Sequence, residues 1–247
     1  MKPGGAKSSP GHLRPVRCLT LIALMVIPLS FGRQKFRDSL AAAPAESSSE
    51  IEAADQVRVL SGILQEMPDR MKLKVLDLFE EKRDYYTRAP STDLSIIEYA
   101  YRAPDSDAFT KEMDLLQSIR TDATSKRCLL VQTSFSVPGK QVFQILLRHP
   151  LHIEGGLARL SVWIHSPDSL NAISVLMRNP RGQRVEVRLG ALAWKGWKRI
   201  TVNLPADRFR TGKDQRYKSG GSFEGFLIRS HPREEAGPMS IMIDNLL

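Results

Sequence analysis

The stretch Leu157–Leu204 decides the fold. It contains four short segments in which apolar and polar residues alternate, namely LARLSVWIHS (157–166), LNAISVLMR (170–178), RVEVRLG (184–190) and GWKRITVNL (196–204). Turn residues separate the segments, as in the Asn-Pro-Arg-Gly tetrad at 179–182. Successive side chains of a strand point to opposite faces, so each segment has one apolar face for a core and one face for water or a partner. Such spacing is typical of an all-β sandwich.

Further segments of this kind lie on both sides of that stretch. We expect strands at residues 71–79, 94–102, 128–137, 142–148, 223–229 and 239–246. The expected total is nine or ten strands, and a basic, glycine-containing loop spans 206–222. Because strands do not alternate with helices, the pattern favours a jelly-roll sandwich over a doubly wound α/β fold.

Two helices are expected before and between the strands. Apolar residues recur every three or four positions over 51–67, which predicts an amphipathic helix, and a short helix is expected over 107–120. The apolar stripe of the first helix would dock on its own domain or on a partner protein.

The N-terminus has the pattern of a secretory signal. A basic segment (1–17) precedes an uncharged apolar run (18–31) that is shorter than the roughly 20 residues of a membrane span. We therefore predict a signal peptide over 1–32 and no stable membrane span after its cleavage; an uncleaved anchor is the alternative. Cleavage would follow Gly32 or Ala45. A linker with the amphipathic helix (33–69) and a sandwich domain (70–247) would complete the chain.

The net charge narrows the class of partner that the protein could bind. The 247 residues contain 36 lysines and arginines against 27 acidic residues, a net charge of +9. Four of the basic residues lie in the first 32, so the remainder carries +5. This excess suits an acidic surface, and no basic helix or basic-aromatic motif indicates nucleic acid.

If the signal, which contains Cys18, is removed, Cys128 has no disulfide partner and is expected to be a small buried hydrophobe.

Motifs for catalysis, cofactors and metals are missing from the sequence. There is no G-x-S-x-G elbow, P-loop or dinucleotide fingerprint. His149 and His152 flank a proline without further ligands, so we expect exposed loop histidines rather than a zinc site. The carboxylate pairs at 80–81 and 234–235 are sequence neighbours, which point to opposite faces of a strand and do not form an acid/base couple.

Three tryptophans are the candidate contact residues: Trp163, Trp194 and Trp197. An aromatic platform on a sandwich can bind a sugar ring or a protein partner, because a rigid ring supplies contact area at low entropic cost. The alternative is that Trp163 and Trp197 belong to a core.

Five segments, taken in order, resemble the spirochaete flagellar filament outer-layer (sheath) protein family, FlaA. They are Leu73–Glu80, Thr133–Gly139, Ile153–Ile164, Gly196–Pro205 and the ending from Phe223 to Asn245. The resemblance covers about residues 70–247, and it does not place the helix at 51–67.

The resemblance implies a galactose-binding-like jelly roll with a structural role and no catalytic residues. Such a protein would coat the flagellin core of a periplasmic flagellum and contribute to filament shape, stiffness and motility. Its expected partners are core flagellin, other sheath proteins and further copies of itself along the filament, in the periplasm. A periplasmic carbohydrate-binding module is the second hypothesis, based on the sandwich and the tryptophans. A secreted hydrolase on a jelly-roll scaffold is the third, and it requires convergent carboxylates or a metal cluster.

Overall fold

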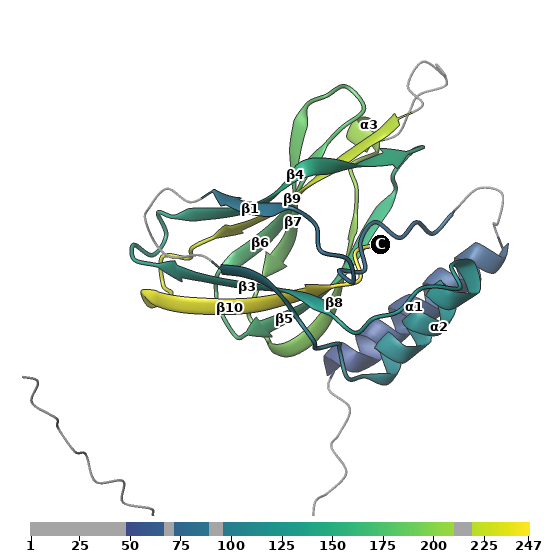
Figure 1. Ribbon diagram of the computed structural model, residues 1–247, viewed down its shortest axis with the longest axis horizontal. Coiled ribbons are helices and arrows are strands. Elements are labelled where there is room, and N and C mark those ends of the chain that lie inside the picture. Colours follow the sequence, from purple (N-terminus) through teal and green to yellow (C-terminus); the bar gives the residue numbers. More distant parts are fainter. Residues whose placement is uncertain (1–47, 67–71, 89–95, 210–218) are drawn as a thin grey trace, which may run out of the picture. The chain divides into compact units, whose positions relative to one another are not determined.

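Two antiparallel sheets of five strands each pack face to face (Figure 1). The computed structural model describes residues 48–66, 72–88, 96–209 and 219–247. The first sheet has the strand order β1-β4-β9-β6-β7. Its strands are β1 (Tyr85–Arg88), β4 (Val142–Glu154), β9 (Ser219–Arg229), β6 (Ala172–Arg178) and β7 (Arg184–Ala191).

The second sheet has the order β2-β3-β10-β5-β8. Its strands are β2 (Ile96–Ala100), β3 (Cys128–Phe135), β10 (Gly237–Asp244), β5 (Arg159–Pro167) and β8 (Lys195–Asn203). Apart from the edge strands β1 and β2, the order β3-β10-β5-β8 faces the order β4-β9-β6-β7. From β3 to β10, consecutive strands alternate between the sheets except for β6 and β7, which pair within one sheet, and this is the strand order of a jelly roll. The predicted all-β jelly-roll sandwich is confirmed.

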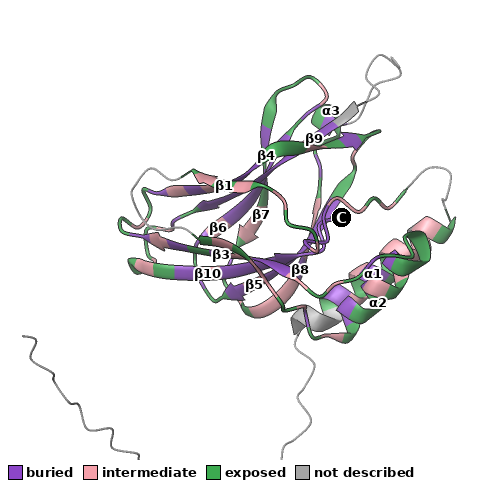
Figure 2. Ribbon diagram, viewed as in Figure 1, coloured by how far each residue is buried: buried purple, intermediate pink, exposed green. Residues whose placement is uncertain are grey.

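The main core fills the space between the sheets, as the alternation predicted. Leu160, Val162 and Ile164 of β5 point inward, and so do the apolar residues at every second position of β6 and β7. Each large aliphatic side chain buried in this way contributes about 1.5–3 kcal/mol. Cys128 is also fully buried, and its burial raises the pKa of the thiol to about 12, as expected of a structural cysteine. Figure 2 shows the buried residues concentrated in the facing strands.

Glycine is required at one point in the centre of the first sheet. Gly225 of β9 has φ +145, and a Cβ there would lie 1.9 Å from the carbonyl oxygen of Ile145 on β4. The registers on both sides of β9 shift nearby, with Leu176 opposite Gly225 and Met177 opposite Phe223. This bulge leaves Glu224 as the extra residue, so that Phe223 and Phe226 can both point into the core.

Two helices lie side by side on the outer face of the second sheet (Figure 1). They are α1 (Ser48–Glu66) and α2 (Asp107–Ile119), which confirms both predicted helices. Ser106 caps α2, since its side chain accepts a hydrogen bond of 3.2 Å from the amide of Phe109. A single turn, α3 (Ala206–Phe209), buries Phe209 in the main core.

The segment 71–79 was predicted as a strand, and this is wrong for its described part. It makes a single antiparallel bridge, between Asp77 and Leu246. The Asp77 carboxylate accepts hydrogen bonds from the amide of Phe79 and from Arg83, and Phe79 has φ +57. This turn ends the extended backbone directly after the bridge.

One strand was not predicted, and the bounds of several others differ from the prediction. The four-residue strand β1 was not predicted, because so short a segment shows no periodicity. Strand β4 continues past Pro150 to Glu154, through a register shift between Leu146 and Leu151 that tolerates the missing proline N–H. Strand β9 begins at Ser219, inside the predicted loop. The predicted signal (1–32), most of the linker and the boundary at 69–70 lie outside the described residues.

Candidate functional site: the helix-covered sheet face and its groove

Trp163 lies beneath α2 and does not present its ring at the surface. It points away from the main core, as the alternation predicted, but it is only 2% exposed. Its ring meets Phe109 of α2 edge to face at 5.5 Å, and its Nε1 donates to Glu112 at 3.0 Å. Together with Ala53 and Ala108, it forms a second, smaller core between the helices and the sheet.

The other two tryptophans do not join Trp163 in one platform. Trp197 is half-buried at the edge of the second core, with its ring 5.5 Å from His165. Trp194 packs against the main core instead, and its Nε1 donates to the carbonyl of Gly196 at 3.1 Å. The three rings are therefore divided between two cores. Contact of Trp194 or Trp197 with a partner or a sugar stays a prediction.

A buried ion pair joins α2 to β8. Glu112 and Arg199 are both almost fully buried, and the Arg199 Nε donates to the Glu112 carboxylate. The same carboxylate accepts from Trp163 and, at 3.2 Å, from the side-chain amide of Asn245. With three donors around it, the buried charge is compensated, which is the condition for such a pair to be tolerated.

The network continues from Arg199 to α1. Its Nη1 donates to Thr201 at 2.8 Å and to the Gln56 side-chain oxygen at 3.3 Å, and Thr201 donates to the same oxygen at 2.9 Å. Lys198 and Glu52 form a partly exposed ion pair at 3.5 Å. Both helices are thus held in register on the sheet by polar contacts as well as by packing.

Asp244, at the end of β10, is a buried acid beside this network. It accepts hydrogen bonds from the Ser125 hydroxyl at 2.9 Å and from the amide of Asn245 at 2.8 Å. Burial raises its pKa to about 8, and the nearby carboxylates of Glu80 and Glu112 add to the rise. The side chain is therefore protonated over most of the physiological pH range.

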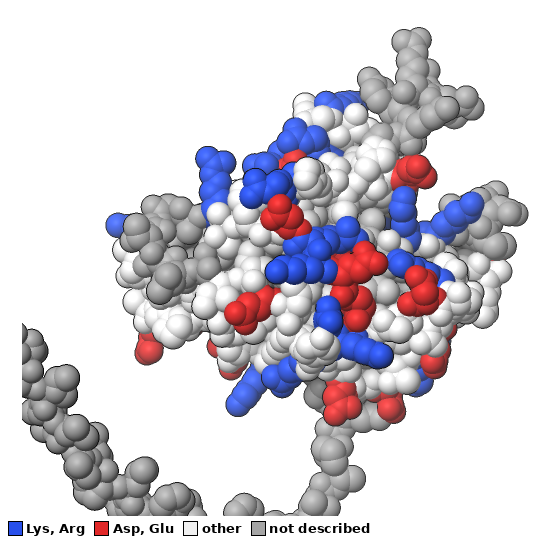
Figure 3. All heavy atoms as spheres, viewed as in Figure 1, with Lys and Arg blue, Asp and Glu red and all other residues white. Residues whose placement is uncertain are grey.

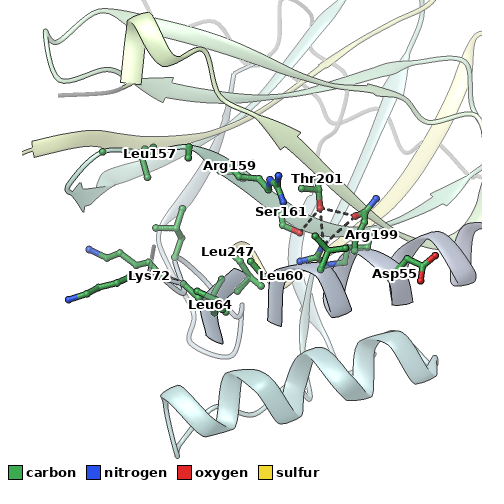
Figure 4. Close-up of a pocket in the computed structure, with 18 of the residues that line it drawn as sticks. Asp55, Leu60, Leu64, Lys72, Leu157, Arg159, Ser161, Arg199, Thr201 and Leu247 are labelled. Atoms are coloured by element: carbon green, nitrogen blue, oxygen red, sulfur yellow. Dashed lines mark hydrogen bonds between the residues drawn. The ribbon is translucent and has the colours of Figure 1, made fainter. Parts of the chain in front are cut away.

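A groove of about 410 Å³ opens beside the network, between α1 and the start of β5 (Figure 4). Leu60 and Leu64 of α1 line it together with Leu157 and the C-terminal Leu247, and Lys72 lies at its edge. The polar cluster around Arg199 closes one end, where Figure 4 draws its hydrogen bonds. The leucine lining gives the groove the chemistry to accept an apolar segment.

The residues considered for catalysis have structural positions. Glu80 accepts the amides of Lys126 and Arg127, and Glu234 accepts from Ser169 and the amide of Leu170. His149 and His152 are exposed, as expected, but on strand β4 rather than in a loop. Among the described residues, no group of three or more His, Cys, Asp or Glu side chains is placed to hold a metal ion. In the same part of the chain, no helix is long and apolar enough to cross a bilayer.

Solved structures with similar chain paths include several sugar-binding modules. One is a family 11 carbohydrate-binding module of a cellulosomal cellulase from Clostridium thermocellum, with 10% identity and a TM-score of 0.39, covering 70% of this chain and 91% of that one. Another is a promiscuous carbohydrate-binding module of the β-sandwich superfamily, with 12% identity and a TM-score of 0.40, covering 66% and 55%. At this similarity no ligand carries over, and the fold assignment rests on the strand order above.

Sequence comparison shows that the C-terminal part of the chain is similar to a known family. Residues 151–247, from the end of β4 through β10, match the family described as flagellar filament outer layer protein Flaa. A putative flagellar filament outer layer-like protein of Brachyspira hyodysenteriae is 28% identical over 123 residues, which is 50% of this chain and 57% of that relative. The last three of the five resembling segments fall inside 151–247. The predicted resemblance is thereby confirmed, and through β5 to β10 this chain is similar to the flagellar filament outer layer proteins.

Proposed function

We propose that the protein is a structural subunit of the outer layer of periplasmic flagellar filaments. It would coat the flagellin core, associate with other sheath proteins and copies of itself, and contribute to filament shape, stiffness and motility. The observation that carries the proposal is the family match over 151–247, which includes six of the ten described strands in full.

The arrangement of the described residues supports a structural role. The conspicuous polar cluster, around Glu112 and Arg199, is buried and internally bonded, so it holds elements together rather than facing a substrate. One member of each carboxylate pair singled out from the sequence, Glu80 and Glu234, likewise bonds to backbone amides. We propose no catalytic activity and no cofactor.

Export to the periplasm is part of the proposal. The signal predicted over 1–32 would be removed after Gly32 or Ala45. Either cleavage leaves α1 intact, since this helix begins at Ser48. N-terminal sequencing of the protein from its natural host is expected to read from residue 33 or 46, and a mature protein that begins at Met1 contradicts export by cleavage.

The test of the coat role is localisation on isolated filaments. Periplasmic flagella purified from the host should react with an antibody to this chain along their length, with anti-flagellin as the positive control and a soluble periplasmic protein as the negative control. Deletion of the gene should give thinner filaments with altered curvature in electron micrographs. Absence of the chain from purified filaments refutes the proposal.

The predicted alternative, a carbohydrate-binding module, requires an exposed row of aromatic rings. Trp163 is buried under α2, and Trp194 and Trp197 pack towards different cores. No contact of the described residues favours this second function.

A further inference from the structure

The outer face of the sheet β1-β4-β9-β6-β7 carries a concentration of arginines. Strand alternation turns the residues between the core positions outward, and six of these are arginines: Arg88, Arg148, Arg178, Arg184, Arg188 and Arg229. Every strand of the sheet contributes at least one. Three carboxylates form ion pairs with these arginines, those of Asp84, Glu186 and Glu224, so these nine groups together carry a charge of +3. We call this surface the arginine face; Figure 3 shows basic side chains outnumbering acidic ones over the region of β1 and β4.

A buried carboxylate orients two of the arginines. Glu224, the extra residue of the β9 bulge, is 5% exposed, whereas Arg178 and Arg184 are 47% and 46% exposed. Arg178 Nε donates to one Glu224 oxygen at 2.8 Å, and Arg184 Nε donates to the other at 2.6 Å. Within the described residues the Arg184 Nη groups make no hydrogen bond, so they stay available to a partner. The two guanidinium groups are thus fixed before any partner binds, which lowers the entropic cost of binding.

A second carboxylate, that of Glu186 on β7, orients Arg229 at the end of β9. Glu186 of β7 accepts from the Arg229 Nη2 at 2.6 Å and from the Ser174 hydroxyl at 2.9 Å. Arg148, near the other edge of the sheet, lies over the ring of Tyr86 at 5.8 Å and pairs with Asp84 at 2.7 Å. Beneath the arginine stems, Leu146, Leu176 and Leu227 form a small apolar cluster. The arginine face therefore consists of oriented guanidinium groups that lie above a small cluster of buried leucines.

The residue types point to carboxylates on a protein as the ligand. No lysine occupies an outward position in the described part of these strands, and arginine is the residue whose planar fork binds carboxylates in a bidentate manner. Nucleobases and sugar rings are bound largely by aromatic stacking. Tyr86 is the one outward-facing Phe, Tyr or Trp residue in the described part of this sheet, and the Arg148 guanidinium lies 5.8 Å from its ring centre. Arginines around an apolar centre are also typical of protein interfaces.

We propose that the arginine face is a docking surface for a carboxylate-rich protein surface. Within the proposed function, on which the identity of the partner rests, that surface belongs to the filament that the subunit coats. The binding chemistry can be measured without a filament.

The probe is poly-L-glutamate, titrated against the purified protein at low ionic strength. The variant R88Q/R188Q removes two exposed arginines that hold no buried carboxylate, so it should leave the fold intact. Because each exposed ion pair contributes little, the loss of two pairs should weaken binding about two- to thirtyfold. The matched control, R58Q/R120Q, removes two exposed arginines from α1 and the end of α2 and should change the affinity less than about twofold. Equal weakening by both variants refutes a specific face.

A second variant tests the orientation of the guanidinium groups. R178K/R184K keeps the charge but removes the two planar guanidinium groups that Glu224 orients. It should therefore weaken poly-L-glutamate binding at least about threefold. Unchanged binding by both face variants overturns the proposal. So does face-dependent binding of single-stranded DNA or dextran sulfate that is tighter than that of poly-L-glutamate, because it assigns the face to phosphate or sulfate polyanions. If the probe binds as expected but the chain is absent from filaments, the docking surface stands and the coat role falls.

Discussion

Two oppositely charged residues are buried beside the second core. Glu112 lies on the buried stripe of α2, between Phe109 and Leu116, where the helical period calls for an apolar residue. Its partner Arg199 lies on the outward side of β8. Removing one member of a buried ion pair leaves an uncompensated charge, whereas neutralising both removes the desolvation cost as well.

We therefore expect R199M to be destabilising and E112Q/R199M to be much less so. The single variant should lose about 3–5 kcal/mol of unfolding free energy. In the double variant, glutamine still accepts hydrogen bonds from Trp163 and Asn245, and most of the loss should be recovered. Urea unfolding of wild type, both single variants and the double variant measures the coupling. Additive losses would show that the pair is not coupled.

The buried acid Asp244 makes stability depend on pH. Its pKa is about 8 in the folded protein, above its ordinary value of 3.8, so the folded state holds the proton more tightly than the unfolded chain. The stabilisation is complete below pH 4 and is lost as the pH rises towards 8. The D244N side chain cannot ionise, so the unfolding free energy of this variant should fall less with rising pH than that of the wild type. The difference should be a few kcal/mol and at most about 5 kcal/mol. Urea unfolding at intervals from pH 4.5 to 8.5 checks it; parallel curves for the two proteins contradict it.

Among the elements, the central strands were predictable and the short or irregular ones were not. Strands β5 to β8 alternate cleanly because one side faces the core and the other faces a different environment. The segment around Asp77 reads as a strand by composition, yet a side-chain-bonded turn ends it after one bridge. The continuation of β4 past Pro150 depends on a register shift that the periodicity of one strand does not contain.

The bulge in β9 offers a test at this scale. G225A should lose about 3 kcal/mol or more of stability, because the added methyl group meets the backbone of β4 and the main chain must move. Gly155 is the matched control: it also has positive φ (+78), but the space around it is open. G155A should therefore cost only the conformational strain, about 1–2 kcal/mol. Thermal unfolding compares the two, and an equal loss would mean that close approach is unimportant.

For the whole molecule, the unexpected feature is the joining of the helices to the sandwich. The amphipathic pattern predicted α1 and left open whether it docks on its own domain or on a partner. The structure docks it on α2 and β8, and Gln56 reaches the Arg199 cluster. The sequence left open whether Trp163 contacts a partner or belongs to a core, since the alternation within a strand does not reveal what lies over its outer face; in the structure α2 covers this ring.

Truncation measures how far the sandwich depends on this cover. A chain of residues 46–247 should unfold at the same urea concentration as one of 33–247. A chain of residues 72–247 lacks α1, exposes part of the second core and removes Gln56 from the polar network. We expect it to lose about 2–4 kcal/mol and to bind a hydrophobic dye. An unchanged midpoint would show that α1 is an independent appendage.

The helical cover gives the protein two unlike sides. On one outer sheet face, α1 and α2 cover β8 and Trp163 of β5 through an internally bonded cluster, while the opposite face presents oriented guanidinium groups. Because its two outer faces differ in chemistry, the protein can present one defined face inward and the other outward in a layer. A cylindrical coat needs that distinction in each building block, because subunits that could lie either way up would give a layer of mixed orientation and no defined curvature.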